Sequence, residues 1–425
     1  MAHNGGRHWL GAHARLGAGP ADLAGPSGDR GHGRAMVRRV PGRPAQRGEP
    51  AAAALPLAGL HRQPPGPDRP TTIVGHTPRS EAFHLKAVRC DRLEGSRAQE
   101  DIHHKMQFDA KVLAIDPAAV TEQIVAHLRS SVLNVLNRRG AVVGLSGGVD
   151  SSVVLALCAR AFGPERVAAL LLQEKESSPD NAVLARQVAR QEGVALLAED
   201  ITGALEGFGC YRRRNEAIRQ VFPEYDSTYR CKISLPGGLL DADTLNVFSL
   251  TVVSPEGETQ TKRLPLDAYL RIVAATNLKQ RTRMATLYYH AEVHGYAVVG
   301  TANRNERDQG FFVKYGDGGI DVDAIVHLYK TQIYALAEYL GIPEEIRRRP
   351  PTTDTYSVPS TQEEFFFRLP FQIMDLLWYA SEHDVSSEDA AHVMGLSPVQ
   401  VERAYHDFER KRRATNYLRA AVLTL

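Results

Sequence analysis

Cysteine is scarce in this sequence, and no two cysteines stand in C-x-x-C spacing. The chain has four, at positions 90, 158, 210 and 231. So few and so widely spaced thiols exclude both a disulfide framework and a cysteine-ligated zinc site. We therefore expect a protein of a reducing compartment, the cytoplasm.

An excess of charge of one sign is also missing. The 51 Lys and Arg residues nearly balance 49 Asp and Glu, which leaves a formal net charge of +2. The chain as a whole therefore has no strong electrostatic field that would favour nucleic acid or membrane as a partner, and any affinity for phosphate must come from a local group of residues. The sequence also lacks a run of eighteen apolar residues and the compact apolar stretch of a secretory signal. Its 43% apolar residues suffice for a large core, so we expect a soluble globular protein.

The first 105 residues contain little that could form a core. They are rich in Gly, Pro, Ala, Arg and His, and show little hydrophobic periodicity. Such a segment buries too little surface to offset its ordering entropy. We interpret residues 1–105 as a disordered or misannotated extension, with a transit peptide or a nucleic-acid-binding arm as alternatives. The folded part is expected to begin near Met106, the anticipated physiological start.

Beyond that point, short apolar runs alternate with helical patterns. Apolar runs at 141–145, 167–172 and 195–200 are separated by a helical pattern through Leu157 and another from Asp180 to Glu192. A helix is expected to start at Asp116-Pro117, a long one to span 266–294, a strand to follow at 296–300, and a further helix at 329–340. Because the strands are apolar throughout, they predict a buried parallel sheet with helices on both faces. The fold class is therefore α/β, a doubly wound, Rossmann-like domain at 106–356.

Two segments depart from this alternation. Between 211 and 265 the sequence reads as an insertion, with a β-hairpin around the Ser-Pro-Glu-Gly-Glu turn at 254–258. Residues 357–425 are expected to form a helical extension. Part of it, 385–413, resembles a helix-turn-helix, which we interpret as a packing element because such helix pairs seldom read DNA without a recognition face.

The strongest local signal lies between the strand at 141–145 and the helix that follows it. It is the loop Ser146-Gly147-Gly148-Val149-Asp150-Ser151-Ser152. Glycines allow close backbone approach, and successive N–H groups at a helix start can cradle a pyrophosphate. The loop is neither Walker A nor G-x-G-x-x-G, since the G-K-[ST] ending and the third glycine are absent. An ordinary glycine-rich turn capped by Ser and Asp is the alternative.

This loop resembles the S-G-G-x-D-S loop of the ATP-pyrophosphatase, or PP-loop, superfamily, which is adenine nucleotide alpha hydrolase-like. Further motifs resemble those of its NAD synthetase family, ammonia-dependent type. They are N-L-K-Q-R-T-R-M at 277–284, G-T-A-N-R-N-E at 300–306, K-Y-G-D-G-G at 314–319, H-L-Y-K-T-Q at 327–332 and P-T-T-D at 351–354. The resemblance implies adenylation of deamido-NAD⁺ by ATP, then displacement of AMP by ammonia, with NAD⁺, AMP and pyrophosphate as products.

The resemblance also assigns roles to residues. ATP would be bound by the loop Ser146–Ser152 together with Arg281, Thr301, Lys330 and Thr352. The dinucleotide would be bound by Asn277, Arg283, Lys314 and Asp317, and Mg²⁺ by Asp150 and Glu306, whose hard oxygens and place after parallel strands suit that ion. Asp150, Lys330 and Asp317 would be catalytic, Asp317 by capturing and deprotonating ammonium. Each has a bland alternative: helix cap, solvated acid, turn residue or surface ion pair.

Several features leave the function partly open. The insertion is absent from compact ammonia-dependent enzymes, so a paralogous amide ligase acting on another carboxylate is the main alternative. A nucleotide-sensing protein with a degenerate site is a third hypothesis, disfavoured by the intact acidic and basic residues. No amidase domain is recognisable, which implies free ammonia or ammonia from a separate amidotransferase. The family resemblance further implies a homodimer.

Overall fold

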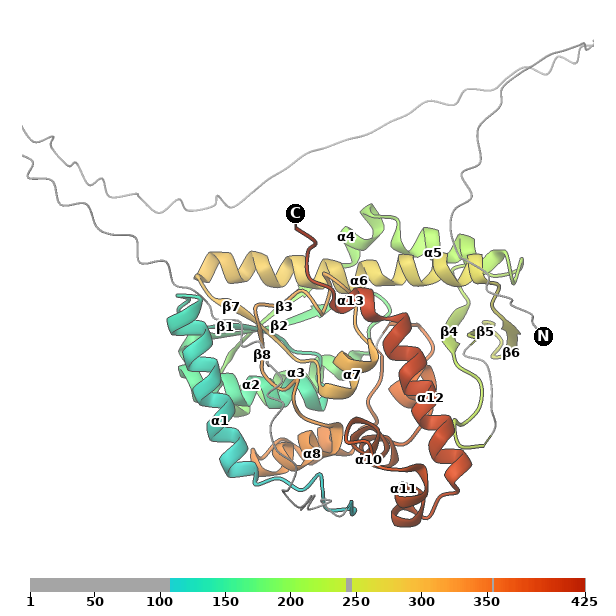
Figure 1. Ribbon diagram of the computed structural model, residues 1–425. Helices are drawn as coiled ribbons and strands as arrows, with labels where there is room; N and C mark the ends of the chain where they lie inside the picture. The colour runs from blue at the N-terminus through green and yellow to red at the C-terminus, as the bar shows by residue number, and fades with distance from the viewer. Residues whose placement is uncertain (1–107, 242–246, 354, 425) are drawn as a thin grey trace, which may run out of the picture. The chain divides into compact units, whose positions relative to one another are not determined.

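The computed structural model describes residues 108–424, except 242–246 and 354 (Figure 1). These residues belong to one compact unit, 98–425. The predicted extension at 1–105 and the start at Met106 lie outside the described residues, as does Asp354 of the P-T-T-D motif.

A five-stranded parallel sheet forms the centre of this unit, in the order β3-β2-β1-β7-β8. Its strands are β1 (Ala141–Gly144), β2 (Val167–Gln173), β3 (Ala195–Asp200), β7 (Ala297–Gly300) and β8 (Val322–Asp323). The four strands expected from the sequence are thereby confirmed, and β8 is an addition. One expectation of burial was wrong: β3 is the sheet edge, and most of its residues are exposed. An apolar strand is buried on both faces only where helices cover both.

Helices cover the two faces of the sheet, as the sequence predicts. Alternate residues of β1 and β2 point to opposite cores: Val143 and Leu171 pack with one group of helices, Val142 and Leu170 with the other. The first group contains α1 (Pro117–Arg129), α2 (Val149–Phe162), α3 (Pro179–Gln191), α8 (Lys330–Tyr339) and α9 (Glu344–Arg348). The second contains α4 (Thr202–Gly207), α5 (Cys210–Arg219) and α6 (Leu266–His294), which crosses the top of Figure 1.

Helix limits follow local sequence signals. The α1 helix begins at Asp116-Pro117 as expected, and the Asp116 carboxylate accepts the N–H groups of Ala118 and Ala119 at 3.0 and 3.3 Å. The α6 helix has the predicted limits and ends at Gly295, whose φ of 66° suits glycine. Two short helical segments complete this part, a π-helix at Ser130–Val135 and a 3₁₀-helix at Pro164–Arg166.

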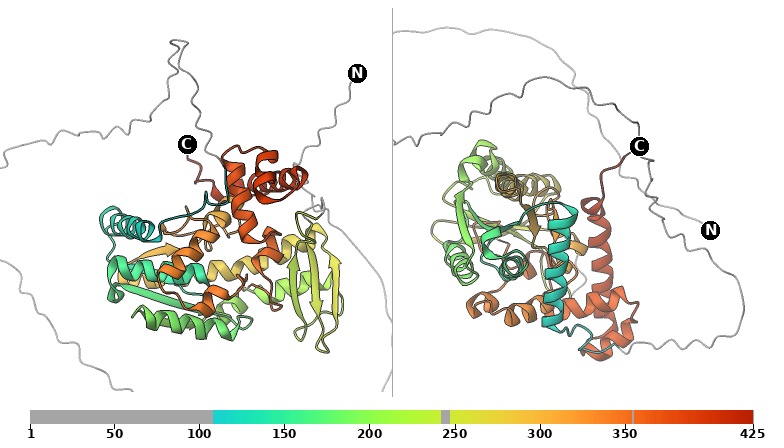
Figure 2. Two further views of the ribbon diagram at one scale, coloured as in Figure 1. Left: turned by 90° about the horizontal axis from the view of Figure 1, so that it is seen from below. Right: turned by 90° about the vertical axis from the view of Figure 1, so that its left-hand side faces the viewer.

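The predicted insertion begins with α5, and from residue 230 it forms a separate three-stranded antiparallel sheet. Its strands are β4 (Arg230–Ser234), β5 (Ser249–Val253) and β6 (Thr259–Arg263), in sequence order. The β5–β6 pair confirms the predicted hairpin, with Gly257 at φ 91° in its turn. Strand β4 was not predicted, because it pairs with β5 across a long connection rather than a tight turn. Figure 2 shows this sheet beside one end of α6, apart from the parallel sheet.

The C-terminal part is helical, as expected. It comprises a π-helical turn at Glu363–Phe367, α10 (Phe371–Glu382), α11 (Ser387–Met394), α12 (Pro398–Ala414) and α13 (Asn416–Arg419). The helix-turn-helix-like pair α11–α12 buries its apolar residues against α10 in one cluster that includes Trp378, Ala391 and Phe408. Among the described helices, none is long and apolar enough to cross a membrane.

Candidate active site

A cavity of about 680 Å³ opens where β1, β2 and β7 end, and Gly144, Gln173 and Gly300 of these strands border it. Ligands of open α/β sheets bind at this edge. Thirteen of the sequence-predicted site residues line the cavity: Ser146, Gly148, Val149, Asp150, Ser151, Asn277, Arg281, Arg283, Thr301, Glu306, Lys314, Asp317 and Thr352. Gly147, Ser152 and Lys330 do not border it.

The loop after β1 is held in shape by its own side chains. Gly147 has a φ of 79°, and a Cβ there would lie 2.7 Å from the carbonyl oxygen of Asn181, so only glycine fits. The Ser152 hydroxyl donates to the Gly148 carbonyl at 2.8 Å, and the Ser151 hydroxyl does so at 3.1 Å. The loop thus leads into α2 with its helix N-terminus at the cavity, a suitable anion cradle.

Asp150 and Glu306 form an acidic pair beside this loop. Burial and, to a lesser extent, the charge of Asp150 raise the pKa of Glu306 to about 8, although the charge of Lys330 opposes the shift. Asn303 joins the two acids: its side-chain amide donates to Asp150 at 3.3 Å, and its backbone N–H donates to Glu306 at 3.1 Å. Two neighbouring carboxyl groups at the cavity offer the hard oxygen ligands that suit a divalent cation.

Lys330 lies behind Asp150 and not in the cavity. Its side chain is fully buried at the start of α8, and its ammonium group forms an ion pair with Asp150. Burial alone lowers the pKa of this ammonium, but the charges of Asp150 and Glu306 outweigh that effect and raise it. Lys330 therefore stays charged and orients Asp150. The family resemblance implied a contact with ATP, but in this structure the ammonium group of Lys330 contacts Asp150 instead.

Asp317 lies in the glycine-rich turn after α7 (Arg304–Gln309). One oxygen of its carboxylate accepts the backbone N–H of Val313 at 2.9 Å, the turn-stabilising contact that was the bland alternative. The residue also borders the cavity. Burial raises the pKa of Asp317 to about 6, against the Val313 hydrogen bond and the charge of Arg283. At neutral pH this carboxylate is ionised and weakly basic.

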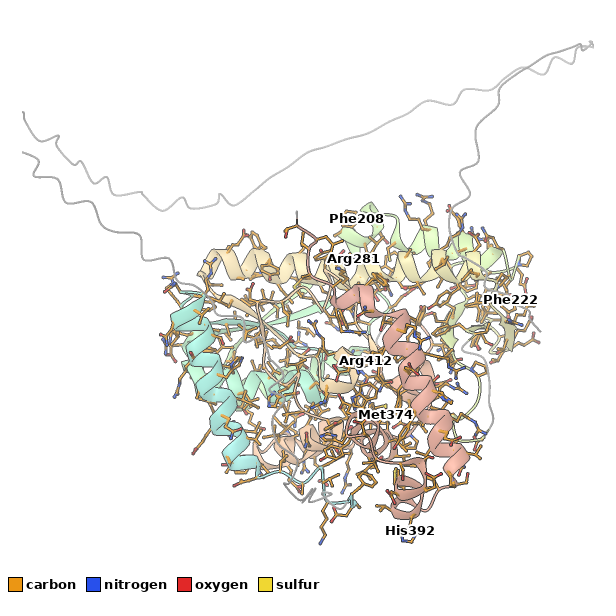
Figure 3. The ribbon with its side chains drawn as sticks, viewed as in Figure 1. Phe208, Phe222, Arg281, Met374, His392 and Arg412 are labelled. Atoms are coloured by element: carbon orange, nitrogen blue, oxygen red, sulfur yellow. The ribbon has the colours of Figure 1, made fainter. Side chains whose placement is uncertain are left out.

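The two arginines of α6 diverge, as their two-residue spacing predicts. Arg281, labelled in Figure 3, donates to the carbonyl of Lys314 at 3.3 Å, on the glycine-rich turn. Arg283 donates to the carbonyl of Leu172 at 3.2 Å, at the end of β2. They border different parts of one cavity, so they cannot hold the same phosphate equally well.

Comparison with known proteins shows which family this chain belongs to. A model of the NAD synthase family matches residues 120–221 and 253–415. The chain belongs to the NAD synthase family. It is 54% identical over 312 residues to the NH(3)-dependent NAD(+) synthetase of Mesorhizobium japonicum, covering 73% of this chain and 98% of that protein. The corresponding protein of Rhizobium meliloti is 49% identical over 74% of this chain and 94% of its own length.

Among solved structures, an NH3-dependent NAD synthetase from Campylobacter jejuni is 21% identical, with a TM-score of 0.47. The alignment covers 73% of this chain and 100% of that chain.

This NAD synthase family member has a buried charge network that the sequence did not reveal. The fully buried Lys279 ammonium donates to Glu174 at 2.8 Å, to Glu176 at 2.7 Å and to the carbonyl of Thr355 at 2.8 Å. Arg214 donates to both carboxylate oxygens of Glu176, at 2.6 and 2.7 Å. The network joins the segment after β2, together with α5 and α6, to the segment that carries Thr352. Its only sequence signal was a lysine inside the motif at 277–284.

The C-terminal segment is a second feature that the sequence did not reveal. Thr415, Tyr417 and Leu418 border the cavity. The Lys314 ammonium, predicted to bind substrate, donates to the carbonyls of Tyr417 and Ala420 at 2.9 and 3.0 Å. In this structure Lys314 therefore fastens the chain end across one side of the cavity.

Proposed function

We propose that this chain converts deamido-NAD⁺, ATP and ammonia into NAD⁺, AMP and pyrophosphate through a carboxyl-adenylate. The observation that carries the proposal is the shared cavity: the loop Ser146–Ser152, the acidic pair Asp150 and Glu306, and Asp317 all border it. Family membership and the names of the relatives support the same reaction. The loop would hold the β and γ phosphates, so that pyrophosphate leaves as the substrate carboxylate attacks the α phosphorus.

Magnesium is the metal that the acidic pair fits. In the described part of the chain no group of three His, Cys, Asp or Glu residues could hold a metal by itself. Mg²⁺ commonly binds through one or two carboxylates, with phosphates and water as the remaining ligands. Asp150 and Glu306 would hold it, and it would neutralise charge on the triphosphate. Lys330 would keep Asp150 oriented from behind.

Asp317 would serve the second half-reaction. Its carboxylate, with a pKa raised by burial to about 6, can bind ammonium at neutral pH and accept a proton as ammonia attacks the acyl-adenylate. Arg283 would help to keep it ionised. Arg281, Thr301 and Thr352 would contact ATP, and Asn277, Arg283 and Lys314 the dinucleotide, once Lys314 exchanges its carbonyl partners for substrate.

The setting of the enzyme is also part of the proposal. The three cysteines among the described residues are buried and unpaired, which supports a reducing, cytoplasmic location. We expect a homodimer, with ammonia taken free from solution or supplied by a separate amidotransferase.

The test is product analysis by mass spectrometry with ATP, Mg²⁺ and ammonium, using a panel of carboxylates that includes deamido-NAD⁺. We expect NAD⁺, AMP and pyrophosphate in equal amounts, and no NAD⁺ when glutamine replaces ammonium. Stoichiometric ADP would contradict adenylation. Turnover of another carboxylate in preference to deamido-NAD⁺ would favour the paralogous ligase.

A further inference from the structure

The insertion contributes an aromatic side chain to the cavity. The family match omits residues 222–252, which contain β4 and most of β5. Phe248 immediately precedes β5 and borders the cavity together with Tyr269 and Val273 of α6. The element that is outside the family match thus forms part of the cavity wall.

Phe248 belongs to a connected group of rings. It stacks on Tyr269 with centroids 4.8 Å apart and an interplanar angle of 18°, and it lies 5.8 Å from Phe365. Phe365 in turn lies 5.8 Å from Phe311 and 5.9 Å from Tyr356. These five residues, which we call the aromatic wall, all border the cavity although they come from four separate parts of the chain.

The position of Phe248 differs from that of the insertion's core residues. Phe222, labelled in Figure 3, Ile233 and Leu250 are fully buried. Phe248 and Tyr269 are only half-buried, and the surface they retain adjoins the cavity.

The length of α6 places the aromatic wall far from the loop end of the cavity. Tyr269 precedes Arg283 by 14 residues on this helix, which corresponds to about 21 Å along the axis. Arg283 donates a hydrogen bond to the carbonyl of Leu172 near the end of β2, and β2 pairs with β1, the strand that leads into the loop Ser146–Ser152. A ligand that contacts both ends must therefore be long, with a planar group at one end.

We propose that the aromatic wall binds one heteroaromatic ring of the dinucleotide, and that Phe248 is a specificity-determining residue supplied by the insertion. The proposal rests on the proposed function, because it takes deamido-NAD⁺ as the long substrate. The offset-stacked rings offer an apolar, π-rich surface, on which a planar base stacks well. We assign the dinucleotide and not ATP because it is the longer of the two ligands and carries a planar ring at either end, as contact with both the aromatic wall and Arg283 requires.

The experiment compares Phe248→Leu, which keeps apolar volume but removes the ring, with Phe248→Trp, which keeps a ring. In the full chain, Phe248→Leu should raise the KM for deamido-NAD⁺ about tenfold, as expected for the loss of one stacking contact. The KM for ATP and kcat should change less than twofold. Phe248→Trp should restore a KM near that of the unmodified chain, which a purely structural role would not do.

Tyr229→Leu is the matched control. Tyr229 is a half-buried aromatic residue of the same insertion that packs on Tyr225 at 5.7 Å and does not border the cavity. Tyr229→Leu should lower thermal stability about as much as Phe248→Leu does, without changing the KM for deamido-NAD⁺ or the KM for ATP. An unchanged KM for deamido-NAD⁺ in folded Phe248→Leu, or a rise only in the KM for ATP, would overturn the inference. Failure of the unmodified chain to use deamido-NAD⁺ would instead refute the proposed function.

Discussion

The buried network around Lys279 gives the most quantitative prediction, through the substitution Lys279→Met. Lys279 and Glu174 are both completely buried. The positive charges of Lys279 and Arg214 balance the negative charges of the two glutamates, Glu174 and Glu176. Methionine would fill a similar volume but leave the network with one uncompensated negative charge. Removing one partner of a buried pair costs about 3–5 kcal/mol.

The pKa of Glu176 gives the energy of the same network at its second carboxylate, where Arg214 contributes more than Lys279. Burial raises the pKa, but the hydrogen bond and charge of Arg214, together with Lys279, outweigh it and lower the pKa from 4.5 to about 2. Each pH unit of such a difference corresponds to about 1.4 kcal/mol, so Glu176 contributes about 3 kcal/mol. Because the pKa is lower in the folded chain, this stability is complete above pH 4.5 and is lost as the pH falls toward 2.

The assay is urea denaturation at pH 7, followed by circular dichroism. Lys175→Met is the matched control, because Lys175 forms an exposed ion pair with Glu206 at 3.0 Å, and such pairs contribute at most about 1 kcal/mol. We expect a loss of about 3–5 kcal/mol for Lys279→Met, and recovery of part of it in the double variant with Glu174→Gln. Equal, small losses for the two lysine variants would refute the reasoning.

Three further predictions concern the site. Asp150→Asn should abolish both AMP formation and carboxylate-dependent exchange of labelled pyrophosphate into ATP, whereas Asp317→Asn should lose amide formation and retain this exchange. Loss of exchange in both folded variants would refute the assignment of Asp150 to adenylation and of Asp317 to ammonia transfer. Amide formation at constant NH₃ concentration should fall as the pH drops through about 6, where Asp317 takes up a proton; the same profile in Asp317→Asn would show that another group is responsible. Gly147→Ala should distort the loop, because φ at this position is 79° and the Asn181 carbonyl leaves no room for a Cβ. A strain of about 1.4 kcal/mol or more should raise the KM for ATP at least tenfold, and an unchanged KM would contradict the phosphate-cradle assignment.

The sequence by itself determined the features that depend on neighbouring residues. Apolar runs such as Ala141–Gly144 predicted the central strands, because burial on both faces requires uninterrupted apolar residues. Asp116-Pro117 predicted a helix start, and the glycines at 147–148 predicted the tight loop into α2. Family motifs then indicated which residues would gather at the ends of the strands, and thirteen of these candidate residues line one cavity.

Tertiary structure decided how those residues act on one another. Lys330 pairs with Asp150, 180 residues away in sequence, and is therefore buried behind the site and not in it. Lys279 reaches Glu174 across 105 residues, and Lys314 reaches the C-terminal segment across 103. Desolvation and charge pairing depend on which distant segments pack together. For the same reason, the exposure of β3, the pKa of Asp317 and the place of Phe248 in the cavity wall could be learned only from the folded chain.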